Sequence, residues 1–256
     1  MLMPRVMPCL LLKNGSLVKT VKFKDPGYIG DPINAIRIYN EKEVDELIFL
    51  DITATLEQRE PPYKVLSEIA SECFMPVTYG GGVHDVESIR RVLSLGIEKI
   101  SINSQAVENP NFIRSAAERF GSSTIVVSMD VRRKMFGRYE VVIHGGRKGT
   151  GLDPVEFASV MEKMGAGEIL LTAIDRDGTQ EGYDIDLIKS VTRAVGIPVV
   201  ACGGAGKVAD FGLAVKEGGA SACAVGSMVV YFGRNRAVLI NYPEREKLEA
   251  VLRQEK

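Results

Sequence analysis

The residues of this sequence best suited to bind phosphate lie in two glycine-rich segments, each directly after an apolar run. The first segment is Gly80-Gly81-Gly82, and the second, Gly203-Gly204-Ala205, begins 123 residues later. Each segment is followed, 23 residues after its first glycine, by a pair of small residues: Asn103-Ser104 in the first half and Gly226-Ser227 in the second. Glycine turns that lead into a helix bring backbone N–H groups up to an anion, although one such turn alone is typical of a tight connection. Because the unit is duplicated, the sequence predicts a ligand with a phosphate at each end.

Aspartates at the ends of apolar runs are the candidates for acid–base chemistry: Asp51, Asp130, Asp175 and Asp177. Asp130 follows the apolar run Ile125–Met129, so we expect its carboxyl group to be partly desolvated, with a raised pKa that suits proton transfer. The alternative is a carboxylate that caps a loop or pairs with Arg132, Arg133 or Lys19.

The first half of the chain has no carboxylate where Asp130 stands in the second half. The corresponding position, at the end of Pro8–Leu12, is Leu11. Leucine cannot transfer a proton. The sequence therefore predicts a pocket with a carboxylate on one side and an isobutyl group on the other.

Charged residues stand at the other end of the apolar runs, where each run begins: Arg5, Glu46, Lys99 and Glu168. Charges at strand starts are commonly solvated. Two acids and two bases at the same mouth of a barrel can instead form a ring of salt bridges across its floor.

Eight short apolar runs alternate with amphipathic segments. The runs, expected to be parallel strands buried on both faces, are Val6–Leu12, Glu46–Asp51, Met75–Tyr79, Lys99–Asn103, Thr124–Asp130, Glu168–Ala173, Ile197–Cys202 and Ala222–Gly226. Capping Asp and Asn residues, early prolines and terminal glycines predict helices over Asp31–Glu43, Asp85–Leu95, Asn109–Phe120, Asp153–Met164 and Asp184–Val195. This order predicts an α/β fold, a (β/α)8 TIM barrel built from two half-barrels, with residues 1–256 as one domain. An open doubly wound sheet is disfavoured because no Gly-x-Gly-x-x-Gly fingerprint follows the first strand.

Two longer segments interrupt the alternation. Lys13–Gly30 follows the first strand, and Gly137–His144 has the pattern of a hairpin arm that leads into Gly145–Gly151. In a barrel of this kind both lie at the C-terminal face, where substrate loops belong.

Composition excludes several classes of function. With 256 residues and a net charge of −1, the chain has no general attraction for nucleic acid or for an anionic membrane. No apolar stretch is long enough to span a bilayer, and Met1–Arg5 leads into a strand without the apolar core of a signal peptide. The four cysteines, Cys9, Cys73, Cys202 and Cys223, form no Cys-x-x-Cys pair, and the two histidines have unrelated spacing. We therefore expect a cytoplasmic protein with reduced thiols, no metal site and no cofactor.

Six motifs resemble the cyclase subunit of imidazole glycerol phosphate synthase, over almost the whole chain from Arg5 to about Ser227. They are Phe49-Leu50-Asp51-Ile52-Thr53-Ala54, Tyr79-Gly80-Gly81-Gly82, Ser101-Ile102-Asn103, His144-Gly145-Gly146-Arg147-Lys148, Asp175-Arg176-Asp177-Gly178-Thr179 and Gly203-Gly204-Ala205-Gly206. The resemblance implies a (β/α)8 barrel that forms a heterodimer with a glutaminase subunit. In that family, ammonia from the glutaminase passes through the barrel core to the C-terminal pocket. There it attacks a ribulosyl aminoimidazole bisphosphate, which is split, and imidazole glycerol phosphate forms by ring closure.

The same resemblance implies roles for particular residues. Asp130 matches one of two catalytic aspartates, and Lys19 matches a lysine of a flexible loop. One phosphate site is matched by Gly82, Asn103 and Ser104, and the other by Asp177, Gly204, Gly226 and Ser227. The ammonia gate at the tunnel entrance is matched by Arg5, Glu46, Lys99 and Glu168.

Two features depart from the family pattern. Leu11 stands where the family has its second catalytic aspartate, and Val229–Pro243 is aromatic and basic where the family has a regular eighth-helix pattern. Both departures resemble a paralogous branch, which works with a paralogous glutaminase and a sugar amidotransferase. That branch converts an acetamido group on a bacterial surface-glycan sugar into an acetamidino group.

Three hypotheses for function follow from these patterns. In the first, the chain is the ammonia-receiving barrel subunit of an amidino-sugar system. In the second, it is a working cyclase of histidine biosynthesis that uses Asp130 and a loop residue such as Asp25 for proton transfer. In the third, it is a non-catalytic scaffold that docks and activates a glutaminase.

Overall fold

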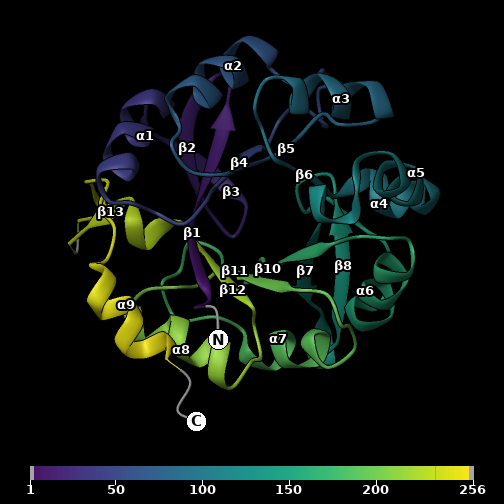
Figure 1. Ribbon diagram of the computed structural model, residues 1–256. Helices are drawn as coiled ribbons and strands as arrows, with labels where there is room; N and C mark the ends of the chain where they lie inside the picture. Colours follow the sequence, from purple (N-terminus) through teal and green to yellow (C-terminus); the bar gives the residue numbers. More distant parts are fainter. Residues whose placement is uncertain (1–2, 234, 254–256) are drawn as a thin grey trace.

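A closed barrel of parallel strands forms the centre of the molecule in the computed structural model, which describes residues 3–233 and 235–253 (Figure 1). Its strands, in spatial order, are β1 (Arg5–Lys13), β4 (Leu47–Asp51), β5 (Val77–Gly80), β6 (Lys99–Ile102), β7 (Ile125–Arg133), β10 (Glu168–Ala173), β11 (Val199–Cys202) and β12 (Ala222–Val225). Each pairs in parallel with the next, and β12 returns to β1. The predicted (β/α)8 barrel, with all eight of its strands, is confirmed.

Helices surround the strands on all sides (Figure 1). They are α1 (Pro32–Glu41), α2 (Tyr63–Glu72), α3 (Val86–Ser94), α4 (Ser104–Glu108), α5 (Pro110–Phe120), α6 (Pro154–Lys163), α7 (Ile185–Thr192), α8 (Val208–Lys216) and α9 (Arg245–Leu252). The capping signals predicted α1, α3, α5, α6 and α7 to within a few residues. The Asp31 side chain, for example, accepts hydrogen bonds from the amides of Ile33 and Asn34 at the start of α1.

The two halves of the barrel repeat one another in detail. Both β1 and β7 continue into antiparallel hairpins, the first formed by β2 (Ser16–Val21) and β3 (Lys24–Gly30), the second by β8 (Tyr139–Ile143) and β9 (Lys148–Gly149). In β1 the register partner of Leu11 is Leu50, and in β7 the partner of Asp130 is Thr172. Leu50 and Thr172 each stand one residue before the end of their strand. Leu11 and Asp130 therefore occupy equivalent places in the two half-barrels.

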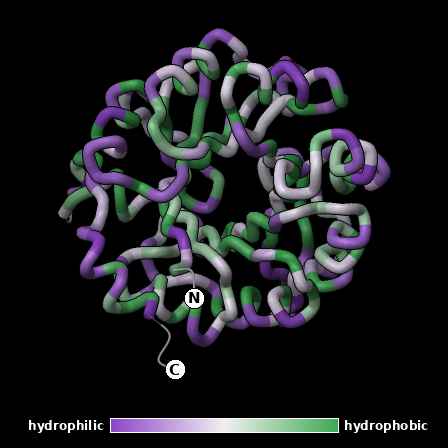
Figure 2. The backbone as a smooth tube through the Cα atoms, in the orientation of Figure 1, coloured by the Kyte–Doolittle hydropathy of each residue, from purple (hydrophilic) through white to green (hydrophobic). Residues whose placement is uncertain are grey.

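Apolar side chains pack on both faces of the barrel strands. The larger cluster lies between strands and helices, and Figure 2 shows hydrophobic and hydrophilic positions alternating along the outer helices. A smaller cluster fills the interior of the barrel: Met7, Cys9, Ile48, Val126, Leu170, Val200, Ala222 and Ala224. This cluster makes the middle of the barrel apolar, between its two mouths. The four cysteines of the chain are unpaired thiols.

The segment after β12, which in the sequence departs from a regular eighth-helix pattern, does not run directly into a helix. A short turn, η3 (Ser227–Val229), leads into a small hairpin of β13 (Tyr231–Phe232) and β14 (Ala237–Val238), and α9 follows. The eighth unit therefore keeps a helix and carries an inserted hairpin before it. No helix of the described ranges is both long and apolar enough to cross a membrane.

Candidate functional site

A cavity of about 570 Å³ opens at the C-terminal ends of the barrel strands. Its walls come from strand ends in both half-barrels, from the β2–β3 hairpin and from the loop after β8. Cavities of this size hold small-molecule ligands. The predicted phosphate residues all line it: Gly82, Asn103, Ser104, Asp177, Gly204, Gly226 and Ser227.

The first cradle, defined here as Gly82, Asn103 and Ser104, is held by hydrogen bonds from Asn103 to β7 and by a contact between Asn103 and Ser104. The Asn103 amide donates to the Ser128 carbonyl at 2.9 Å and to Asp130 Oδ2 at 3.3 Å, and the Ser104 hydroxyl lies 3.3 Å from Asn103 Oδ1. Gly82 has a φ of 69°, and a Cβ there would lie 2.4 Å from the Arg59 carbonyl. The close approach of the Arg59 backbone therefore requires glycine at position 82, whether or not an anion is bound there.

The second cradle, defined as Gly204, Gly226 and Ser227, repeats this geometry. A Cβ on Gly204 would lie 2.2 Å from the Gly182 carbonyl. Gly226, with φ −118° and ψ −86°, has almost the backbone conformation of Asn103, at −110° and −86°. Each is followed by a short helical turn that begins with serine. The predicted duplication is thus present in the backbone of the site.

The Lys19 ammonium group reaches the second cradle from the β2–β3 hairpin. Its side chain is buried, and a Cβ built on Gly226 would fall 2.2 Å from Lys19 Nζ. Across residues 3–233 and 235–253 it makes no salt bridge. A buried cation without a protein anion favours an anionic ligand at this position.

Asp177 holds the hairpin that carries Lys19. Its carboxylate accepts a hydrogen bond from the Thr20 hydroxyl at 3.1 Å, and its carbonyl accepts one from the Lys22 amide at 2.9 Å. Its own amide donates within the turn after β10, to the Ala173 carbonyl. Asp177 thus anchors the hairpin that carries Lys19, and it also lines the cavity.

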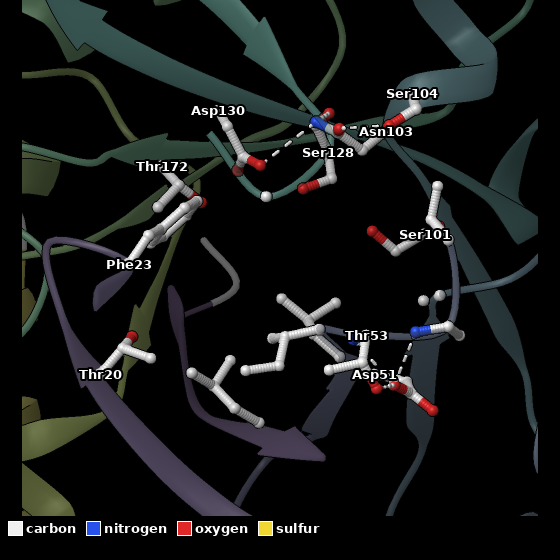
Figure 3. Close-up of a pocket in the computed structure, with 18 of the residues that line it drawn as sticks. Thr20, Phe23, Asp51, Thr53, Ser101, Asn103, Ser104, Ser128, Asp130 and Thr172 are labelled. Atoms are coloured by element: carbon white, nitrogen blue, oxygen red, sulfur yellow. Dashed lines mark hydrogen bonds between the residues drawn. The ribbon is translucent and has the colours of Figure 1, made fainter. Parts of the chain in front are cut away.

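Asp130 projects into the cavity from the end of β7 and is buried (Figure 3). Burial, together with the nearby negative charge of Asp177, raises the pKa of Asp130 to about 7, against a smaller opposing effect of the Thr172 hydroxyl. A carboxyl group with this pKa can both accept and donate a proton near neutral pH. Leu11 lines the same cavity from β1 and is 7% exposed, so the carboxylate and the isobutyl group share one pocket.

The other candidate carboxylates have structural partners. Asp51, across the cavity in Figure 3, accepts hydrogen bonds from the amides of Thr53 and Ala54 and pairs with Arg59. Asp175 accepts a hydrogen bond from the Arg133 amide at 2.6 Å. Asp25 is exposed on β3 and does not line the cavity. Asp130 therefore remains the candidate for proton transfer.

His144 and Glu108, to which the sequence patterns assigned no role, also line the cavity. His144 Nε2 lies 3.0 Å from Glu108 Oε1, and the His144 amide donates to the Ser104 hydroxyl at 3.1 Å. In the sequence, His144 opens one of the six motifs that resemble the family. Its partner stands 36 positions away, so spacing alone does not reveal the pair.

At the opposite mouth of the barrel, the four predicted gate residues form a closed ring. Arg5 pairs with both Glu46 and Glu168, and Lys99 Nζ lies 3.1 Å from Glu46 and 3.0 Å from Glu168. The Thr78 hydroxyl donates to the second oxygen of Glu46 at 2.7 Å. The ring lies across the floor of the barrel, below the apolar interior.

In the described parts of the chain, no cluster of three or more His, Cys, Asp or Glu side chains could hold a metal ion.

The chain is thus a (β/α)8 barrel with duplicated glycine-rich turns at one mouth and a ring of ion pairs at the other. Residues 5–235 match the family described as "Histidine biosynthesis protein", and the chain belongs to that family. Among its relatives, a Pseudomonas aeruginosa protein provisionally named imidazole glycerol phosphate synthase subunit hisF2 is 50% identical over 245 residues, which cover 96% of this chain and 98% of that protein.

Two further relatives extend the comparison. The imidazole glycerol phosphate synthase subunit HisF of Alkaliphilus metalliredigens is 47% identical over 231 residues, 90% of this chain and 92% of that protein. A Leptospira interrogans protein, provisionally named as a HisF subunit of the same synthase, is 46% identical over 252 residues, 98% of this chain and 99% of that protein. The chain is thus a HisF-like cyclase-family barrel.

Proposed function

We propose that this protein is the barrel subunit of a glutamine amidotransferase complex, and that it receives ammonia from a glutaminase and delivers it to a phosphorylated ligand held in the C-terminal pocket. The ligand is a bis-anion whose two ends occupy the two cradles. The product of the pathway is an acetamidino sugar of a bacterial surface glycan, formed together with a sugar amidotransferase. The whole chain, 1–256, acts as one domain in the cytoplasm.

The observation that carries this proposal is the equivalence of Leu11 and Asp130 in the two half-barrels. A ring-closing lyase step that needs two carboxyl groups on opposite sides of the ligand has one of them here. Loss of one partner from a two-group proton relay costs several orders of magnitude in rate. Ammonia delivery needs only the tunnel, the ligand site and one proton-transfer group.

The two mouths of the barrel support an ammonia route. Arg5, Glu46, Lys99 and Glu168 form a ring of ion pairs across the floor, which in this proposal limits the entry of bulk water. The interior above the ring is lined by apolar side chains. A neutral ammonia molecule crosses such an interior at less cost than ammonium or another ion, because burial penalises charge. The anion pocket lies at the far end of that route.

Coexpression with each candidate glutaminase from the same genome tests the proposal. We expect one glutaminase to copurify with the barrel and to gain glutamine hydrolysis when the pocket ligand is added. Copurification with none of them, or hydrolysis that is indifferent to the barrel, would exclude the proposed complex.

The second candidate is a working cyclase of histidine biosynthesis, which the raised pKa of Asp130 and the two intact cradles favour. Complementation of a strain that lacks the histidine-pathway cyclase separates the candidates, because growth without histidine would refute the amidino-sugar proposal. If the wild type does not turn over the bisphosphate and Leu11→Asp does, the result would support the amidino-sugar proposal. The scaffold alternative predicts that Asp130→Asn leaves pathway output intact.

A further inference from the structure

His144 stands next to the first cradle without belonging to the residues so far assigned to it. It follows β8 directly, lines the cavity, and its amide is hydrogen-bonded to the hydroxyl of Ser104, a member of the cradle. Its ring is partly buried, with 28% of the side chain exposed. An anion seated on Ser104 therefore lies within reach of this ring.

Glu108 fixes how the His144 ring is turned. Glu108 Oε1 lies 3.0 Å from His144 Nε2. Because a carboxylate only accepts hydrogen bonds, Nε2 carries the hydrogen and donates it to Glu108 in a hydrogen bond. Among the hydrogen bonds of the described residues, none involves Nδ1 of His144, so Nδ1 is the nitrogen left for a ligand. A carboxylate behind an imidazole also stabilises the imidazolium form, which donates from Nδ1 to an anion.

The backbone at His144 is held in an unfavourable conformation. His144 has a φ of 54°, and Gly145 and Gly146 follow at 63° and 77°. The left-handed region disfavours residues with side chains, and glycine would relax the turn at this position. Such conformations are concentrated at functional sites. The histidine is kept in place by its bonds to Ser104 and Glu108 rather than by its own preference.

The two cradles differ in the cation they carry. The second has Lys19, whereas Arg59, whose carbonyl lies against Gly82 of the first, has its guanidinium group paired with Asp51 and Glu57. We propose that His144, turned by Glu108, is a direct ligand of the phosphate group in the first cradle. This rests on the proposed phosphorylated ligand. One end of that ligand then lies against the Lys19 ammonium group and the other against the His144 imidazole.

Other charges face the His144–Glu108 pair and enter the same equilibrium. Lys148 Nζ lies 3.8 Å from Glu108 Oε1, Arg147 lines the cavity, and Arg132 donates to the Gly146 carbonyl at 3.3 Å. A dianion bound beside the ring favours the imidazolium form, so anion binding and protonation of His144 are coupled.

The imidazole ¹⁵N signals of the full chain test this directly, because only two histidines contribute. Inorganic sulfate is the probe, since it keeps its two charges across the pH range in which histidine titrates. We expect sulfate to raise the titration midpoint of His144 by about half a unit to one unit and to move that of His84 less. We also expect calorimetry to show sulfate binding about tenfold tighter near pH 6 than near pH 8 in the wild type.

His144→Asn is the main variant, because asparagine tolerates the left-handed backbone and removes the titrating group. It should lose the preference for low pH, and Glu108→Gln should fall between it and the wild type. Lys19→Met is the control, which should weaken sulfate binding equally at both pH values. A His144 midpoint that ignores sulfate, while Lys19-dependent binding persists, would overturn the His144 proposal and leave the proposed function standing. Absence of sulfate binding in every variant would overturn both.

Discussion

The ammonium group of Lys19 occupies the space that a side chain on Gly226 would take, since a Cβ there would lie 2.2 Å from Nζ. Two segments more than 200 positions apart in the sequence therefore build the second cradle together. Gly226 gives the lysine room, and the hairpin anchored on Asp177 delivers it.

Gly226→Ala should consequently act as a Lys19 variant. Asn103 adopts nearly the same φ and ψ as Gly226, so the backbone there accepts a side chain and the substitution acts by displacing the ammonium group. Loss of a charge-assisted contact weakens anion binding by about 10- to 100-fold. Calorimetry with inorganic phosphate should show the same loss in Gly226→Ala, in Lys19→Ala and in the double variant. Additive losses in the double variant would contradict the shared mechanism.

Asp130→Asn should stabilise the protein above neutral pH. The folded-state pKa of Asp130 is about 7, whereas the group has a pKa of 3.8 when unperturbed, so the folded state binds the proton more tightly. Stability from this group is full below about pH 4 and is lost as the pH rises toward 7. The asparagine variant mimics the neutral acid and avoids this loss of stability, which is about 4 kcal/mol by pH 8. Urea unfolding at pH 5 and pH 8 should show the difference between variant and wild type growing with pH, and a constant difference would contradict it.

The barrel could be predicted from the sequence because its strands are continuous apolar runs and five helices carry capping signals. Two of the helices that escaped prediction lack such signals: α2 begins after Pro62 and α9 after Glu244, neither of which makes a side-chain capping bond. Helix formation there depends on packing of the apolar face, which local signals do not encode.

The candidate site was predictable where it repeats and hidden where it depends on tertiary contact. Gly82 and Gly204 stand out because the chain duplicates their turns. The approach of Lys19 to Gly226 depends on how a hairpin folds over the barrel mouth, and the contact of His144 with Glu108 joins β8 to α4. Such contacts have no fixed sequence spacing.

Leu11→Asp should place a second acid opposite Asp130 at a cost in stability that depends on pH. Leu11 is 7% exposed and lines a pocket that already contains a carboxyl group with a raised pKa. Two carboxyl groups in one site disfavour double ionisation, so the pKa of Asp130 should rise further. We expect a loss of about 2–4 kcal/mol at pH 8 and a smaller loss at pH 5, with Leu11→Asn as the uncharged control. Equal losses at both pH values would mean that the new carboxylate is solvated away from Asp130.

Lys99→Met should destabilise the protein by leaving two buried acids with fewer partners. The side chains of Glu46 and Glu168 are 3% and 8% exposed, and each bonds to Lys99 and to Arg5. Removal of one partner from a buried ion pair costs about 3–5 kcal/mol, and the remaining contact with Arg5 should reduce this to about 2 kcal/mol.

Chemical denaturation at neutral pH measures the Lys99→Met loss against a matched surface pair. Arg37 and Glu72 are 61% and 37% exposed, so Arg37→Met should cost less than about 0.5 kcal/mol. Adding Glu46→Gln to Lys99→Met should recover part of the loss, because the neutral amide no longer needs a cation. If Lys99→Met costs no more than Arg37→Met, the ring is solvated, and it cannot exclude water from the floor of the barrel.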